Sequence, residues 1–118
     1  MRLEGTRVFL VEDDDLVAMS VEDMLQEISC QVVDSAGSLD EAIEKARIGE
    51  FDCALLDVSL RGKEVYPVAT VLAERNVPYI FASGYGRTAL PPQFQDQPMV
   101  AKPFLVDDLA AALRALPD

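Results

Sequence analysis

The stretch Val8-Phe9-Leu10-Val11-Glu12-Asp13-Asp14 joins a short apolar run directly to three acidic residues. An apolar run without alternating polar residues is typical of a strand covered on both faces, as in a parallel sheet between two layers of helices. We therefore interpret Val8–Val11 as the first strand of such a sheet. Four further runs are interpreted as strands: Gln31–Val33, Cys53–Leu56, Tyr79–Ala82 and Met99–Ala101.

The segments between these runs carry apolar residues at helical spacing. Ser38, with Glu41 three residues later, predicts a capping box at the start of the second helix. Residues 84–98 contain two glycines and three prolines, so a helix there is expected to be short or mobile. The expected apolar stripes are Val17, Val21, Met24, Leu25 and Ile28; Leu39, Ala42, Ile43 and Ala46; Val65, Ala69, Leu72 and Ala73; and Val106, Leu109, Ala110 and Leu113.

This alternation of strands and helices predicts an α/β fold, a doubly wound five-stranded parallel sheet sandwiched by helices. The length of 118 residues is that of one domain, which we expect to span residues 1–118. The side chains of Met19, Met24 and Phe104 are expected to belong to its core.

The composition narrows the classes of partner. With 21 acidic and 10 basic residues the net charge is −11, which disfavours nucleic acid because its phosphates are bound mainly by lysine and arginine. No apolar run approaches the ~20 residues that span a bilayer, so no membrane partner is expected. Cys30 and Cys53 lie in apolar runs and are interpreted as buried free thiols, which is typical of a reducing, cytoplasmic location.

Polar side chains follow four of the five expected strands. Glu12 and Asp13 come after the first strand, and Asp57 comes after the third; Ser83 and Lys102 follow the fourth and fifth. In doubly wound sheets ligands bind at the carboxyl ends of the strands, so we expect these side chains to meet. Any one of them alone would be an ordinary loop residue, but four coincident strand ends favour a site.

Three carboxylates that meet repel one another, and a divalent cation relieves that repulsion. The chain contains no histidine, and neither cysteine lies at a strand end, so the oxygen ligands favour Mg²⁺ over zinc or copper. Lys102 and Ser83 then suit phosphoryl oxygens, and the whole set indicates phosphoryl transfer. Asp57 follows a buried run in the middle of the sheet and is the expected nucleophile.

Four motifs together resemble the receiver domain of bacterial two-component response regulators. They are Leu10-Val11-Glu12-Asp13-Asp14, Leu55-Leu56-Asp57, Ser83 after an apolar strand, and Lys102-Pro103-Phe104. The resemblance covers the whole chain, and the order and spacing of the motifs make it specific. It implies a flavodoxin-like sheet whose five strands lie in the order 2-1-3-4-5.

By this resemblance Asp57 is the phosphoacceptor, with Asp13 as the main Mg²⁺ ligand and Glu12 as a ligand acting through water. Ser59 is then expected to offer its backbone carbonyl to the metal. Lys102 contacts the phosphoryl group, Ser83 is the switch hydroxyl, and the Lys102–Pro103 bond is cis.

Residues 78–85 are similar to the Phe-Ala-Thr-Gly-hydrophobic-Tyr signature of a subgroup of single-domain receivers. A switch through Ser83, Gly84 and Tyr85 that moves residues 84–98 is our hypothesis; the alternative is a plain glycine-rich turn with Tyr85 in the core. The chain departs from the common receiver pattern at Arg61, where many receivers carry proline, and at Met99, where an aromatic switch residue is usual.

The resemblance implies a single-domain response regulator that takes a phosphoryl group from a sensor histidine kinase or a histidine phosphotransfer protein. This regulator is then expected to hydrolyse its own acyl phosphate and to catalyse no other reaction. It signals to a target protein or drains phosphoryl groups, as a monomer or weak dimer. The alternatives are a degenerate receiver used only for docking, a small Asp-nucleophile phosphatase, which lacks its second Asp at Ser59, and a flavodoxin-like binder, which lacks a glycine-rich loop.

Overall fold

A computed structural model describes all residues, 1–118. Five parallel strands form one sheet, in the order β2-β1-β3-β6-β7. These strands are β1 (Arg7–Val11), β2 (Gln31–Ala36), β3 (Cys53–Asp57), β6 (Tyr79–Ser83) and β7 (Met99–Ala101). The order confirms the predicted 2-1-3-4-5 arrangement, with β6 and β7 as the fourth and fifth strands of the sheet.

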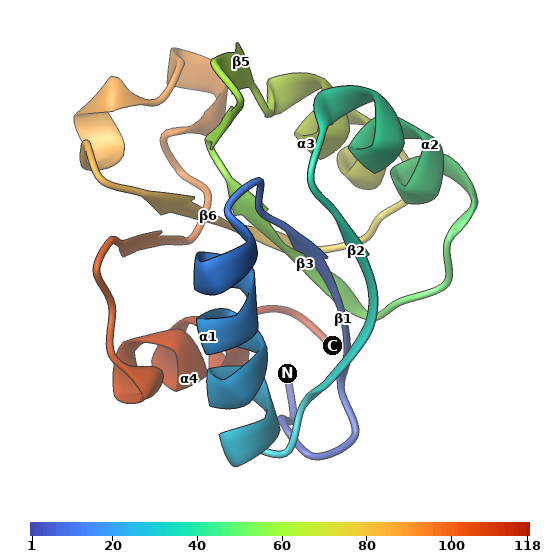
Figure 1. Ribbon diagram of the computed structural model, residues 1–118, viewed down its shortest axis with the longest axis vertical. Coiled ribbons are helices and arrows are strands. Elements are labelled where there is room, and N and C mark those ends of the chain that lie inside the picture. Colours follow the sequence, from blue (N-terminus) through green and yellow to red (C-terminus); the bar gives the residue numbers. More distant parts are fainter.

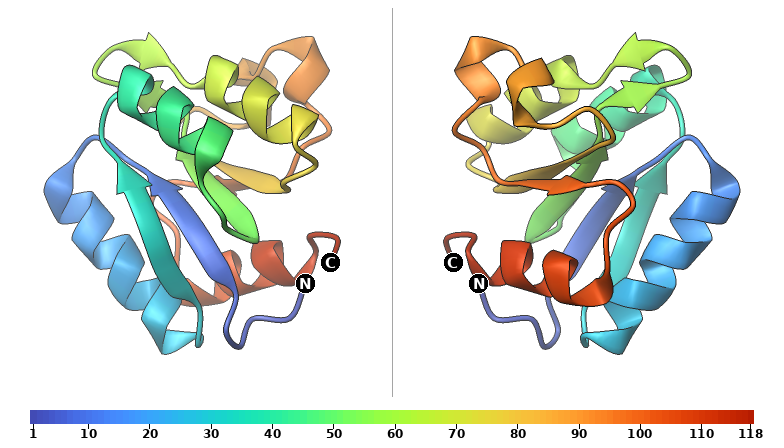
Figure 2. Two further views of the ribbon diagram at one scale, coloured as in Figure 1. Left: turned by 90° about the vertical axis from the view of Figure 1, so that its right-hand side faces the viewer. Right: turned by 90° about the vertical axis from the view of Figure 1, so that its left-hand side faces the viewer.

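Helices cover both faces of the sheet (Figures 1 and 2). One layer consists of α1 (Asp15–Glu27) and α4 (Val106–Arg114), and the other of α2 (Leu39–Ile48) and α3 (Tyr66–Glu74). None of the helices has the length and apolar character needed to cross a membrane.

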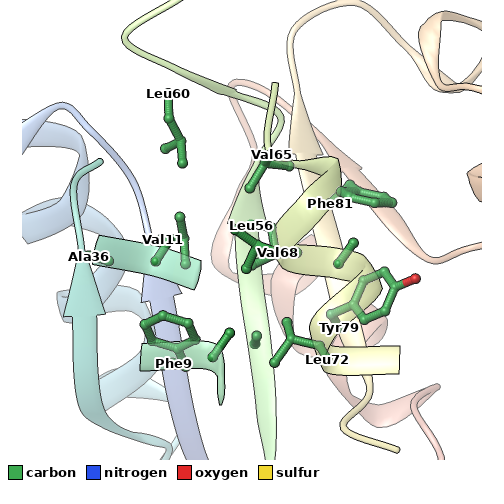
Figure 3. Close-up of a cluster of buried hydrophobic side chains, with 14 of the residues drawn as sticks. Phe9, Val11, Ala36, Leu56, Leu60, Val65, Val68, Leu72, Tyr79 and Phe81 are labelled. Atoms are coloured by element: carbon green, nitrogen blue, oxygen red, sulfur yellow. The ribbon is translucent and has the colours of Figure 1, made fainter. Parts of the chain in front are cut away.

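The absence of alternation in the strands is explained by two cores, one on each face. Phe9, Leu56 and Phe81 point to the side of α2 and α3, as Figure 3 shows. Leu10 and Ile80, their neighbours in sequence, point to the side of α1 and α4. Because successive side chains of a strand point to opposite faces, both sets must be apolar when both faces are covered.

Both cysteines are free and buried, as predicted. Cys53 is fully buried in the α1/α4 core, and its desolvation raises the pKa of its thiol to about 12. The cysteines therefore act as small apolar side chains of the core.

Residues 84–98 contain two 3₁₀ turns, Arg87–Ala89 and Pro92–Phe94, in place of a full helix. The segment therefore contains only short helical turns, as predicted from its glycines and prolines. The Arg87 guanidinium ties it together by donating hydrogen bonds to the carbonyl oxygens of Gln95 (2.8 Å) and Gln97 (2.6 Å). Phe94 is buried against the core: its ring stacks on Tyr66 with 5.1 Å between the ring centroids.

Three sequence-based expectations were incomplete or wrong. A short hairpin of β4 (Ser59–Leu60) and β5 (Lys63–Glu64) between β3 and α3 was not predicted. Met19, expected in the core, is 62% exposed. In the expected capping box the Ser38 hydroxyl does accept from the Glu41 N–H (3.3 Å), but the Glu41 carboxylate accepts from the Gly37 N–H (2.9 Å) rather than from the N-cap residue.

Phe81 lies at the centre of an aromatic cluster with Tyr66, Tyr79 and Phe94, at centroid distances of 5.8, 5.4 and 5.6 Å. We expect Phe81→Ala to lower the free energy of unfolding by about 3–5 kcal/mol, since it leaves a cavity in a fully buried region. Urea unfolding measures this change. Leu105→Ala, at a side chain that is 72% exposed, is the control and should shift stability by less than about 0.5 kcal/mol. Equal losses in the two variants would contradict the central place of Phe81 in the core.

Candidate functional site

The polar residues predicted from the strand ends do meet at one edge of the sheet. Main-chain hydrogen bonds continue past the strands and fix their positions: the Glu12 N–H donates to the Ala36 carbonyl (3.0 Å), and the Lys102 N–H donates to the Ser83 carbonyl (2.9 Å). One carboxylate oxygen from each of Glu12, Asp13 and Asp57 lies within 4.8 Å of the others. The three carboxylates therefore form a cluster at the ends of β1 and β3.

Lys102 lies between two of these carboxylates. Its Nζ is 2.7 Å from Glu12 Oε1 and 3.3 Å from Asp57 Oδ2. Desolvation alone would lower the pKa of Lys102, but its hydrogen bond to Glu12 and the charges of both carboxylates outweigh that effect and raise it. The ammonium group thus stays charged and compensates part of the negative charge of the cluster.

Glu12 is the most buried member of the cluster, with 7% of its surface exposed. Burial raises its pKa above the ordinary value, even though hydrogen bonds from Lys102 and from the Asp14 N–H oppose the shift. The nearby charge of Asp57 adds to the increase. A further cation at the cluster would favour the ionised form of Glu12.

Asp13 is held from the β4–β5 hairpin. Its Oδ2 accepts a hydrogen bond of 2.8 Å from the N–H of Arg61. Partial burial raises the pKa of Asp13, but hydrogen bonds, the one from Arg61 first among them, outweigh burial and leave the pKa below its ordinary value. Asp13 is therefore an ionised carboxylate in a fixed orientation.

Asp14, the third acidic residue of the run, has a different role. Its side chain caps α1 by accepting hydrogen bonds from the N–H groups of Leu16 (2.9 Å) and Val17 (3.2 Å). A capping carboxylate satisfies N–H groups that have no partner within the helix. Asp14 thus fixes the start of α1 beside the cluster and contributes no ligand atom to it.

Ser83 and Tyr85 lie at the end of β6. Ser83 is 3% exposed, and its Oγ accepts a hydrogen bond of 3.1 Å from the Tyr85 N–H. Tyr85 is 83% exposed, so the alternative that placed its side chain in the core is wrong. The glycine-rich turn after Ser83 therefore presents an aromatic side chain to solvent.

The donor set fits a hard divalent cation. Three carboxylates from two adjacent strand ends supply oxygen ligands only, which is what Mg²⁺ prefers. The Ser59 N–H donates to Asp57 Oδ1 at 3.4 Å, which places Ser59 beside the cluster; its carbonyl as a ligand stays a prediction. The Lys102–Pro103 peptide bond is cis, as the resemblance implied.

Sequence reasoning missed an apolar groove beside the site. It is lined by Val17 and Met24 of α1 and by Lys102, Pro103 and Phe104. Leu16, which also lines the groove, is 78% exposed, and Met19, three residues later on α1, is 62% exposed. The signal was present in the sequence, since Leu16 and Met19 lie outside the apolar stripe expected for this helix.

Comparison with known proteins identifies the relatives of this arrangement. A family model described as the response regulator receiver domain matches residues 8–114. The solution structure of SdrG from Sphingomonas melonis Fr1 is 37% identical, covers 98% of each chain and superimposes with a TM-score of 0.83. The crystal structure of the response regulator PhyR from Brucella abortus is 28% identical, with a TM-score of 0.74, over 92% of this chain and 46% of PhyR.

Among curated proteins, the transcriptional regulatory protein PdtaR of Mycobacterium tuberculosis is 28% identical over 111 residues, 91% of this chain and 54% of PdtaR. The cell cycle response regulator CtrA of Brucella ovis is 30% identical over 115 residues, 93% of this chain and 49% of CtrA. The chain thus spans about half the length of the curated relatives that it matches.

We expect Lys102→Met to lower the free energy of unfolding by about 1–3 kcal/mol, because it leaves the buried carboxylate of Glu12 without its cationic partner. The double variant Lys102→Met/Glu12→Gln should recover part of that loss, since the uncompensated charge is gone. Urea unfolding at neutral pH measures both.

The matched control is Lys45→Met, which removes a lysine paired with Asp34 (3.1 Å) and Glu41 (3.5 Å) at the surface. Its cost should stay below about 1 kcal/mol. A Lys102 variant as stable as this control would show that the ion pair contributes little to the fold.

Proposed function

This chain belongs to the response regulator receiver domain family, and from that premise we propose that Asp57 accepts a phosphoryl group in an Mg²⁺-dependent reaction. The donor is a phosphohistidine of a sensor kinase or of a histidine phosphotransfer protein. The observation that carries the proposal is the contact of Lys102 with both Glu12 and Asp57, within a cluster of three carboxylates.

The reaction is a displacement at phosphorus. A carboxylate oxygen of Asp57 attacks, the phosphorus–nitrogen bond of the phosphohistidine breaks, and its electron pair returns to the imidazole. The product is an acyl phosphate on Asp57. Catalysis of this kind depends on positioning and on charge stabilisation more than on further covalent chemistry.

Each site residue has a role in that step. Glu12 and Asp13 hold the cation together with Asp57, and Ser59 offers its carbonyl. Mg²⁺, when bound, neutralises charge on the transferring group. Lys102 gives up part of its contact with Asp57 Oδ2, 3.3 Å away, to pair with a phosphoryl oxygen.

Ser83 acts after transfer. Its Oγ accepts a hydrogen bond from the Tyr85 N–H, so the proton of its hydroxyl group is free to donate to a phosphoryl oxygen. A new bond there pulls on the turn that carries Gly84 and Tyr85. This is the proposed switch: the new hydrogen bond of Ser83 displaces the turn, and residues 84–98 move with it.

Hydrolysis ends the signal. Water attacks the phosphorus, the bond to Asp57 breaks, and inorganic phosphate leaves together with a regenerated carboxylate. Ser59, small and exposed beside Asp57, leaves room for that water. The protein acts on its own phosphoryl group and on no other substrate.

The groove along α1 is the proposed docking surface for the phosphodonor. Lys102 lines the groove and contacts Asp57, so a protein seated there brings its phosphohistidine close to Asp57. The exposed side chain of Leu16 belongs to the same lining, and Met19, three residues later on α1, is also exposed. Burial of exposed apolar side chains of this kind is a common source of binding energy between proteins.

The receiver is proposed to act as a single-domain regulator, and the match with SdrG over 98% of both chains supports a unit of this size. Its output is a contact with another protein or the removal of phosphoryl groups from the kinase. The exposure of Tyr85 next to the switch hydroxyl favours the first route, because a turn that moves would present a different surface.

We expect incubation with acetyl phosphate and Mg²⁺ to add the mass of one phosphoryl group to the wild-type protein. Asp57→Asn should abolish the gain, and chelation of Mg²⁺ should suppress it. Intact-protein mass spectrometry measures all three.

Asp23→Asn is the matched control, since Asp23 is an exposed carboxylate on α1 that makes no hydrogen bond or ion pair. It should gain mass like the wild type. A wild-type protein that takes up nothing would favour the docking-only alternative, and a gain that persists in Asp57→Asn would place the acceptor elsewhere.

With beryllofluoride and Mg²⁺ as a phosphoryl mimic, we expect the amide NMR signals of residues 83–98 to shift more than those of α2, which lies away from the switch. Ser83→Ala should reduce the shifts within residues 84–98 while leaving those near Asp57. If the amide NMR signals of residues 84–98 do not shift when the mimic is added, the switch hypothesis is wrong.

A further inference from the structure

The β4–β5 hairpin has the tightest turn that a hairpin can have. Leu60 pairs with Lys63, so Arg61 and Gly62 alone form the turn. Their φ angles are +51° and +81°, both in the left-handed region that two-residue hairpin turns require. Arginine adopts this conformation at some cost, whereas glycine adopts it freely.

The hairpin is fixed to the body of the protein at its base and on one face. The Val65 N–H donates to the Val58 carbonyl at 2.9 Å, which closes the base. The side chain of Leu60 is 1% exposed and packs in the α2/α3 core. The turn is therefore held by buried contacts, although its own residues are exposed.

Two N–H groups of this hairpin point at two different carboxylates of the cluster. Ser59 donates to Asp57 Oδ1 at 3.4 Å, and Arg61, two residues later, donates to Asp13 Oδ2 at 2.8 Å. The second bond is the shorter, and it joins residues 48 positions apart. It is the contact that connects the hairpin to the carboxyl end of β1.

We propose that the main-chain N–H of Arg61 is a positioning group for the cation site: it orients the Asp13 carboxylate through Oδ2 and leaves Oδ1 for the cation. This inference rests on the Mg²⁺ site of the proposed function. A carboxylate that is already oriented loses less freedom when it binds a cation. Loss of a hydrogen bond to a metal ligand typically weakens metal affinity 10–100-fold.

The guanidinium group is not the functional part of Arg61 in this proposal. The Nη2 atom of Arg61 lies near Gly37, 3.9 Å from the place that a Cβ on Gly37 would occupy. The guanidinium group makes no hydrogen bond or ion pair. The two parts of the residue can therefore be separated by mutation. Arg61→Gly keeps the N–H and suits the turn, whereas Arg61→Pro removes the N–H and cannot adopt a positive φ.

The first experiment is an Mg²⁺ titration of the wild type, Arg61→Gly and Arg61→Pro, followed by calorimetry. We expect Arg61→Pro to bind Mg²⁺ at least about tenfold more weakly. Arg61→Gly should stay within about threefold of the wild type, since it keeps the hydrogen bond that matters. Wild-type affinity in Arg61→Pro, or equal losses in the two variants, would overturn the proposal.

The second experiment needs no metal and does not depend on whether Arg61→Pro folds. Amide hydrogen exchange of Arg61 is compared in the wild type, in Asp13→Ala and in the control Asp23→Ala. We expect the exposed amide of Arg61 to be protected in the wild type and to exchange at least about tenfold faster in Asp13→Ala only. Unchanged exchange in Asp13→Ala would mean that the bond does not hold Asp13.

The two experiments also separate the inference from the proposed function. A wild-type protein that binds no Mg²⁺ would refute the cation site, and this inference with it. A wild-type protein that binds Mg²⁺ through Asp57 while Arg61→Pro binds equally well would refute only the role of the hairpin.

Discussion

The site depends on the two ion pairs that the ammonium group of Lys102 makes with Glu12 and Asp57. Three carboxylate oxygens within 4.8 Å of one another would repel strongly at a partly buried position, and a single cation from the far end of the chain reduces that repulsion. Lys102 is 90 residues away from Glu12 and reaches it only because β7 has joined the edge of the sheet. The site therefore exists only when the whole sheet has formed, so the fold and the proposed chemistry are coupled through one side chain.

Most of the fold, and the place of the site, could be predicted from the sequence because both follow from simple geometry. Runs such as Cys53–Leu56 lack alternation because two helical layers cover the sheet, so the pattern itself indicates the layers. Parallel strands end at the same edge, so the sequence alone predicts that residues as distant as Asp13 and Lys102 meet. The segment after Ser83 was predicted to lack a full helix from its glycines and prolines alone.

The rest could not be predicted, because it depends on contacts that leave no periodic signal. The hairpin of Ser59–Glu64 is too short and polar to show alternation, and only the Arg61-Gly62 pair hinted at a turn. Asp14 looks like its neighbours in sequence, yet it caps α1, whereas Glu12 and Asp13 join the cluster. Met19 is the exception: its position outside the apolar stripe, two residues from both Val17 and Val21, did indicate exposure, and only its apolar character led to the expectation of a core residue.

The burial of Phe94 restricts how residues 84–98 can rearrange. Its ring fills space between Tyr66 and Phe81, and Phe81 lies only two residues before the hydroxyl of the proposed switch. A segment that swung away as a whole would uncover two aromatic faces and open a void under β6, a cost of about 2–3 kcal/mol for one buried aromatic ring. The motion that costs the least free energy is a rotation about Phe94, in which the part of the segment that carries Tyr85 turns while the ring of Phe94 stays buried. Signals from this protein would then be transmitted by rotation of the turn that carries Tyr85 about a fixed axis, the buried side chain of Phe94.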